Sequence, residues 1–163
     1  MVGSRVHFTE RLPTKRMAAD CLFTNEAGHL LVIKPTYKPT WDIPGGAVEH
    51  DESPRRAAQR EVHEELGLVI EPGRLLAVDW LARAGDFTEV VAFLFDGGVL
   101  TSADINQLAP HPTEATALDF VPLDEAERLL DAELFARVRA AVDAQHTAAA
   151  TYLENGVVPP HTT

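Results

Sequence analysis

The sequence has 163 residues, of which 45% are hydrophobic and 24% are charged. This length and composition suit one globular domain and exclude a wholly disordered chain. The 25 Asp and Glu residues outnumber the 14 Lys and Arg residues and give a formal charge of −11, which argues against a protein that coats a nucleic acid polymer. The single cysteine, Cys21, excludes an intramolecular disulfide and indicates a reducing, cytoplasmic compartment.

Five β-rich runs, separated by Gly, Pro and Asn, predict strands at residues 17–24, 29–34, 74–82, 87–95 and 117–121. We expect a hairpin turn at residues 25–28, because Asn and Gly favour turn geometry. Residues 34–40 contain two prolines and predict a loop, and residues 41–44 form a short extended segment. No apolar run approaches the roughly 18 residues of a membrane-spanning helix, and no signal peptide is apparent, so no membrane association is expected.

Three segments predict helices. Residues 53–66 begin with Ser and Pro, which suit the N-cap and the first helical position, and Gly67 fits the position after the helix. Residues 122–125 open a small helix, and an alanine-rich helix is expected over residues 132–154, with Asn155-Gly156 as its end. The order of strands, helix, strands and helices predicts an α/β fold with a mixed sheet between helices.

These elements predict one domain over residues 17–156. A loosely attached polar segment at residues 1–16 would precede it, and a disordered tail at residues 157–163 would follow it, because terminal segments with prolines are seldom fixed. The alanine-rich helix could pack on its own sheet or on a second subunit, so the sequence leaves a homodimer open.

Three carboxylates share one face of the first predicted helix. Glu61, Glu64 and Glu65 lie at positions i, i+3 and i+4, within an arc about 100° wide. Like charges at this spacing destabilise a helix by about 0.2–0.5 kcal/mol per pair. A bound cation would reverse that cost, since Mg²⁺ and Mn²⁺ prefer such oxygen ligands. A solvated acidic face is the alternative interpretation.

The spacing over residues 46–68 resembles the Nudix box, the signature of the Nudix hydrolase family. The box reads Gly, five residues, Glu, seven residues, Arg-Glu, an aliphatic residue, any residue, Glu-Glu, any residue, Gly and an aliphatic residue. Every fixed position is filled, by Gly46, Glu52, Arg60, Glu61, Val62, Glu64, Glu65, Gly67 and Leu68. The resemblance implies the family's α/β/α sandwich with a mixed β-sheet. It also implies a loop-helix that binds Mg²⁺, or Mn²⁺ as a substitute, and cleaves a diphosphate bond.

The resemblance also implies roles for single residues. The metal ligands would be the backbone carbonyl of Gly45 and the carboxylates of Glu61, Glu64, Glu65 and Glu114. Glu52 and Arg60 would form a structural ion pair. The general base stays open between Glu61 and Glu114, because members of the family differ in the carboxylate that takes the proton.

The expected substrate is a small diphosphate, a nucleoside diphosphate derivative or a nucleoside triphosphate. The cationic side chains of Lys34, Lys38 and Arg83 are candidate substrate contacts. Ala84 stands where members that act on ADP-ribose tend to carry Pro and those that act on dinucleoside polyphosphates tend to carry Tyr, so no subfamily is indicated. A prenyl or sugar diphosphate is an alternative substrate, and a ligand-sensing module without turnover is an alternative function.

Overall fold

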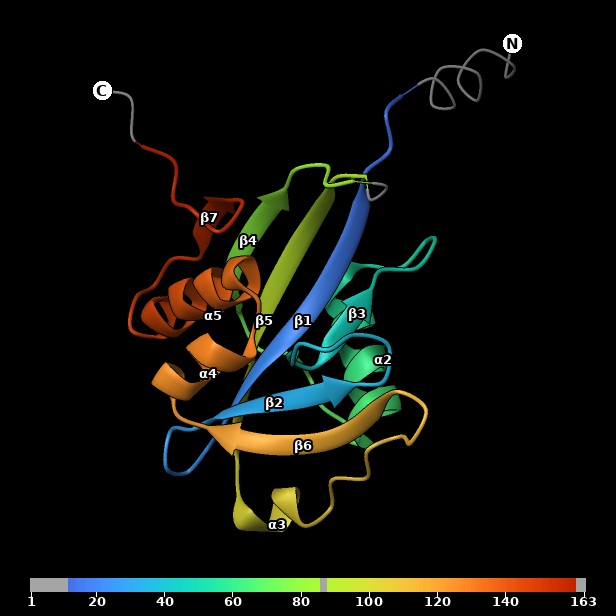
Figure 1. The fold of residues 1–163 in the computed structure, drawn as a ribbon, viewed down its shortest axis with the longest axis vertical. Coiled ribbons are helices and arrows are strands. Elements are labelled where there is room, and N and C mark those ends of the chain that lie inside the picture. The colour runs from blue at the N-terminus through green and yellow to red at the C-terminus, as the bar shows by residue number, and fades with distance from the viewer. Residues whose placement is uncertain (1–11, 86–87, 161–163) are drawn as a thin grey trace.

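The computed structural model describes residues 12–85 and 88–160. Its strands form a seven-stranded mixed sheet in the order β6-β2-β1-β5-β4-β7, with β3 paired to β1 beside this path (Figure 1). The strands are β1 (Arg16–Asn25), β2 (Leu30–Pro35), β3 (Gly45–Ala47), β4 (Leu75–Leu81), β5 (Val90–Leu100), β6 (Ala115–Val121) and β7 (Thr151–Glu154). The helices are α2 (Pro54–Leu66), α3 (Ser102–Ile105), α4 (Leu123–Leu129) and α5 (Ala132–Gln145). The predicted α/β fold with a mixed sheet is therefore confirmed.

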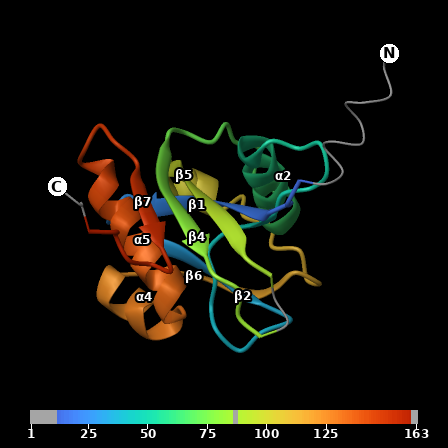
Figure 2. The same cartoon turned by 90° about the horizontal axis from the view of Figure 1, so that it is seen from above.

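Helices cover both faces of the sheet. Helix α2 lies on one face, and α4 and α5 lie on the other (Figure 2). Because neighbouring residues of a strand point to opposite faces, β1 contributes to two cores. Its Cys21 and Phe23 pack with α2, and Leu22 packs with α4 and α5. The central strands are thus buried on both sides, which fixes the position of α2 relative to α5.

The predicted hairpin is present between β1 and β2, which pair antiparallel. The side chain of Asn25 accepts hydrogen bonds from the backbone N–H groups of Ala27 and His29, at 3.0 and 2.9 Å. Gly28 has a φ of +76°, a conformation that glycine adopts without steric cost. The side-chain hydrogen bonds of Asn25 and the positive φ of Gly28 thus favour the same turn.

The expected long C-terminal helix is wrong in its second half. Helix α5 ends at Gln145, and residues 151–154 form β7, which pairs in parallel with β4. The unpaired backbone groups along the edge of β4 need hydrogen-bond partners, and Thr and Tyr in this segment favour a strand. Asn155 and Gly156 have φ values of +51° and +75° and end β7 instead of a helix.

Three further elements differ from the expectations. The strand expected at residues 87–95 runs from Val90 to Leu100, and neither β3 nor the short α3 was predicted. Residues 1–11, 86–87 and 161–163, which include most of the expected N-terminal segment and the end of the tail, lie outside the described residues. Among the helices that the structure describes, none has the length and apolar composition needed to cross a membrane.

Candidate active site

Helix α2 begins and ends where its sequence predicts. The Ser53 hydroxyl caps the N-terminus by accepting the N–H of Arg56 at 3.4 Å, and Pro54 occupies the first helical position. Gly67 is left-handed, with a φ of +72°, and its N–H donates to the His63 carbonyl at 2.9 Å. The residues that anchor α2 to the sheet are buried: Ala57, Ala58, Val62 and Leu66. This anchored face fixes the direction of the three carboxylates.

The backbone of β3 lies against two of these carboxylates, Glu61 and Glu65. A Cβ atom on Gly46 would lie 2.5 Å from the Cδ atom of Glu61, and one on Gly45 would lie 2.5 Å from the Cα atom of Asp20. Side chains are therefore excluded at both glycines. The N–H of Gly45 donates to Oε2 of Glu65 at 2.9 Å. Gly46 thus lets the chain lie against Glu61, and Gly45 lets it lie against β1 while its N–H group bonds to Glu65.

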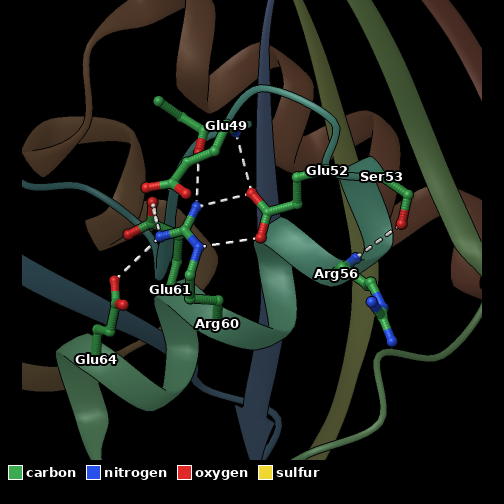
Figure 3. Close-up of polar contacts among 8 residues, drawn as sticks. Glu49, Glu52, Ser53, Arg56, Arg60, Glu61 and Glu64 are labelled. Carbon is green, nitrogen blue, oxygen red and sulfur yellow. Dashed lines mark hydrogen bonds and ion pairs between the residues drawn. The ribbon is translucent and has the colours of Figure 1, made fainter.

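Arg60 joins the loop to the helix through three carboxylates (Figure 3). Its Nε and Nη2 atoms donate to the two carboxylate oxygens of Glu52 at 3.0 and 2.9 Å, and Nη2 also donates to the Ala47 carbonyl at 3.0 Å. Its Nη1 atom donates to Glu61 at 2.8 Å and to Glu64 at 3.0 Å. The structure therefore contains the Glu52–Arg60 ion pair, and Arg60 also offsets the charge of two candidate metal ligands, which the sequence pattern did not indicate.

Burial raises the pKa of carboxyl groups at this site, and hydrogen bonds from Arg60 and Gly45 lower it. Burial raises the pKa of Glu65 to about 8, and it raises the pKa of Glu61 above its usual range. The hydrogen bond from Arg60 instead lowers the pKa of Glu52. The nearby charges of Asp42 and Asp20 add to the rise at Glu65. A cation at this face would favour the ionised form of these groups.

A loop from α3 to β6 brings a fourth carboxylate to the helix. The N–H groups of Ala109 and His111 donate to the last carbonyls of α2, those of Leu66 and Glu65, at 2.9 and 3.1 Å. This contact closes a pocket of about 310 Å³, the α2 pocket, which is lined by Glu61, Glu64, Glu65, His111 and Glu114. The structure thus places Glu114 beside the three helix carboxylates.

His111 is a site residue that the sequence reasoning missed. Its Nδ1 atom lies 2.8 Å from the Thr113 hydroxyl, and its ring lines the α2 pocket. The signal in the sequence was its position three residues before Glu114, between two prolines. The ring thus adds a nitrogen-bearing side chain to a pocket otherwise lined by carboxylates.

A second cavity of about 380 Å³ lies between β1 and α5 and is called here the β1–α5 groove. It is lined by Arg16, Met17, Ala18, Asp20, Tyr37, Lys38, Asp42, Gly45, Gly46, Ala47, Leu81, Val90, Ala92, Asp131, Glu133, Leu134 and Arg137. Gly45 and Gly46 line this groove on one side and contact Glu65 and Glu61 on the other. The groove and the α2 pocket are therefore neighbours across β3.

The three candidate substrate cations occupy different places. Lys38 lines the β1–α5 groove and forms an ion pair with Asp42 at 2.6 Å. Lys34 is outside the groove lining, and its Nζ atom lies 5.9 Å from the centre of the Trp41 ring. Arg83 is exposed beyond the end of β4, and its Nε atom donates to the Gly85 carbonyl at 3.4 Å. The structure brings only Lys38 to the cavity.

The donor set suits a hard divalent cation, although its side chains are not arranged around one. Within residues 12–85 and 88–160, no three His, Cys, Asp or Glu side chains are grouped as a metal site. The α2 pocket nevertheless offers four carboxylates, the ligand type that Mg²⁺ and Mn²⁺ prefer. The Nη1 atom of Arg60 bonds to one oxygen each of Glu61 and Glu64, so a cation could bind through the second oxygen of each carboxylate.

Comparisons with known proteins agree with this architecture. The chain is 31% identical over 128 residues to a "MutT-like protein" of Streptomyces ambofaciens, which covers 76% of this chain and 74% of the relative. It is 40% identical over 65 residues to rat "Diphosphoinositol polyphosphate phosphohydrolase 2", which covers 39% of this chain and 36% of that protein. Among solved structures, a MutT protein from Methanosarcina mazei Go1 superposes with a TM-score of 0.69 at 24% identity, over 83% of this chain and 99% of the other.

An α/β/α sandwich in which two glycines lie against the carboxylates of a helix is the architecture of a Nudix protein. The family model described as "NUDIX domain" matches residues 14–142, and the chain belongs to this family. It is a hydrolase that acts on diphosphate bonds. Nudix hydrolases generally use a divalent metal and act on small diphosphate-containing substrates.

Proposed function

We propose that the protein hydrolyses a diphosphate bond of a nucleoside diphosphate derivative or a nucleoside triphosphate, with Mg²⁺, or Mn²⁺ as a substitute. The observation that carries this proposal is the α2 pocket, where Glu114 joins Glu61, Glu64 and Glu65 around one cavity of about 310 Å³. A concentration of carboxylates would repel a diphosphate, unless cations offset their charge.

We assign different roles in the reaction to the side chains of the α2 pocket. Glu61, Glu64 and Glu65 would hold the cation, with the Gly45 carbonyl as a further ligand. When bound, the metal offsets phosphate charge and lowers the pKa of a coordinated water. The attacking water forms a bond to phosphorus while the P–O bond of the anhydride breaks, and Glu61 or Glu114 accepts the proton of the water. Arg60 fixes the loop through Glu52.

The nucleotide substrate is supported by the similarity to the MutT-like protein of Streptomyces ambofaciens, which extends over 76% of this chain. The shorter match to a diphosphoinositol polyphosphate phosphohydrolase supports the alternative, a non-nucleotide diphosphate. The intact set of four carboxylates favours turnover over a sensing module. Of the three candidate cations, Lys38 has the support of its position in the β1–α5 groove, and we propose it as a substrate contact.

The remaining features of the proposal concern the whole chain. We propose that residues 17–156 act as one catalytic domain and that the protein works in the cytoplasm, for which its single cysteine, fully buried, is the support. A homodimer is retained as an alternative to a monomer, and sedimentation of the purified protein distinguishes the two.

The test is a hydrolysis screen. Purified protein is incubated with nucleotides and with prenyl and sugar diphosphates, with Mg²⁺, with Mn²⁺ or with a chelator, and phosphate and pyrophosphate are measured. We expect metal-dependent release from a nucleotide, and rates at least about 100-fold lower for Glu64→Gln and Glu65→Gln. Glu127→Gln, which changes an exposed carboxylate on α4, is the control. Unchanged rates in both pocket variants would overturn the assignment of the metal ligands.

A further inference from the structure

The β1–α5 groove contains a buried arginine whose hydrogen-bonding capacity is only partly used. Arg137 of α5 is 7% exposed and lies between two carboxyl groups. Its Nη1 atom donates to Oδ2 of Asp79 at 3.3 Å, and its Nη2 atom lies 3.8 Å from Oδ2 of Asp20, beyond hydrogen-bond distance. Its Nε atom has no hydrogen-bond partner among the residues that the structure describes. The Nη1 side of the guanidinium group thus has a hydrogen-bond acceptor, whereas the edge formed by Nε and Nη2 has none within hydrogen-bond distance among the described residues.

The unmatched edge has a defined shape. In a planar guanidinium group, the N–H groups of Nε and Nη2 are parallel and form a fork that fits two adjacent acceptors. Leaving buried donors without acceptors costs about 1–3 kcal/mol. Asp79 does not reach this edge, because its two oxygens accept from Nη1 of Arg137 and from the N–H of Gly156. A ligand in the groove that Arg137 lines could supply the two acceptors.

The charge of the groove favours a neutral ligand group over another anion. Its basic lining residues are Arg16, Lys38 and Arg137, and its carboxyl groups are those of Asp20, Asp42, Asp131 and Glu133. Lys38 already pairs with Asp42, and Nη2 of Arg16 donates to the Thr88 carbonyl. A phosphate would therefore face more carboxyl groups than cations. The apolar lining suits a flat ring: Met17, Ala18, Leu81, Val90, Ala92 and Leu134.

We propose that Arg137 is a specificity-determining residue whose Nε and Nη2 atoms donate to the O6 and N7 atoms of a 6-oxopurine base bound in the β1–α5 groove. This inference rests on the proposed nucleotide hydrolysis and adds the identity of the base. The O6 and N7 atoms of guanine are two adjacent acceptors on one edge, which is the partner that an arginine fork fits. Adenine presents an amino donor in place of O6, so it opposes one N–H of the fork with another.

The test compares ligands that differ only at this edge. Binding of guanosine, 7-deazaguanosine and adenosine monophosphates is measured by calorimetry, and the hydrolysis of the corresponding triphosphates is measured in parallel. We expect the guanine compound to bind at least about tenfold more tightly than the other two, with a matching change in KM and little change in kcat. Arg137→Lys keeps the positive charge but removes the fork, so the variant should bind all three compounds equally. Arg139→Lys, on the exposed side of α5, should bind as the unaltered protein does.

The outcomes separate this inference from the proposed function. Equal or absent binding of the three monophosphates by the unaltered protein overturns the role of Arg137, even if Arg137→Lys does not fold. Preferential binding of adenosine monophosphate overturns it as well. Tenfold discrimination by the unaltered protein that persists in a folded Arg137→Lys variant assigns the selectivity elsewhere. Tenfold discrimination that Arg137→Lys abolishes, with no hydrolysis of any triphosphate, supports the inference and overturns only the nucleotide hydrolysis.

Discussion

A Cβ atom added to Gly46 would lie 2.5 Å from the Cδ atom of Glu61. No real Cβ atom tolerates such a distance to a carboxyl carbon, so either the loop or the Glu61 side chain must move. The glycine of the Nudix box therefore has a physical explanation in this chain: it allows β3 to approach the acidic face of α2. Two residues that are 15 positions apart in the sequence thus define the shape of the site.

The first prediction concerns this contact. Gly46→Ala should lower kcat by about 100-fold, because a displacement of about 1 Å at a catalytic group can cost that much. It should also lower the free energy of unfolding by about 1–3 kcal/mol through overpacking. Steady-state kinetics and urea unfolding measure the two effects. Gly28→Ala is the control, because its strain at a φ of +76° lowers stability far from the site and should leave kcat unchanged.

The second prediction concerns the bidentate pair of Glu52 and Arg60. Glu52→Gln should lower the free energy of unfolding by up to about 1 kcal/mol and raise the Mg²⁺ concentration for half-maximal rate, because Arg60 then interacts more with Glu61 and Glu64. Glu71→Gln removes a more exposed pair with Arg55, whose closest atoms are 3.8 Å apart, and should change neither quantity. Equal Mg²⁺ requirements in the two variants would show that Glu52 does not restrain Arg60.

The third prediction concerns the buried carboxylate of Asp79. Asp79→Ala should lower the free energy of unfolding by about 3–5 kcal/mol, because it leaves the Arg137 charge without its hydrogen-bonded partner. It also removes the acceptor for the N–H of Gly156, which follows β7. Asp119→Ala, at an exposed position of β6, should cost less than about 1 kcal/mol. A loss that small for Asp79→Ala would mean that the pair contributes no net stability.

The fourth prediction concerns the thiol of Cys21. Burial raises its pKa from about 9 to about 12, and the neighbouring Asp20 adds to the rise. The folded state therefore favours the neutral thiol, and this contribution to stability is complete below pH 9 and is lost as the pH rises toward 12. Iodoacetamide should consequently modify the native protein at pH 8 far more slowly than the urea-unfolded protein. Similar labelling rates in the two states would show that the thiol is accessible in the fold.

The parts of the fold that local sequence determines were predictable. The caps of α2, the hairpin after β1 and the spacing of Glu61, Glu64 and Glu65 depend on residues close together in the chain. The segment of residues 146–154 was not predictable in this way. Its alanines favour a helix, but pairing with the edge of β4, about 75 residues earlier, determines its structure.

The candidate site also combines features that the sequence indicated with contacts that only the folded chain reveals. The motif indicated the helix carboxylates, and the wider resemblance to the family indicated Glu114, which stands just before a predicted strand. Neither indicated that Arg60 bonds to Glu61 and Glu64, that His111 lines the α2 pocket, or that Arg137 lies between Asp20 and Asp79. Each of these contacts depends on side-chain directions or on segments brought together only by the folded sheet.

A metal titration of the reaction rate tests the proposed metal site most directly. Initial rates of nucleotide hydrolysis are measured from metal-free conditions to saturating Mn²⁺ for the unaltered protein, Glu65→Gln and the control Glu127→Gln. We expect no activity without metal and saturation in the unaltered protein and the control. Glu65→Gln should need a higher Mn²⁺ concentration for its half-maximal rate and should reach a much lower maximal rate. Hydrolysis that is equally fast with a chelator, or a titration curve of Glu65→Gln that coincides with that of the unaltered protein, would contradict the proposed metal site.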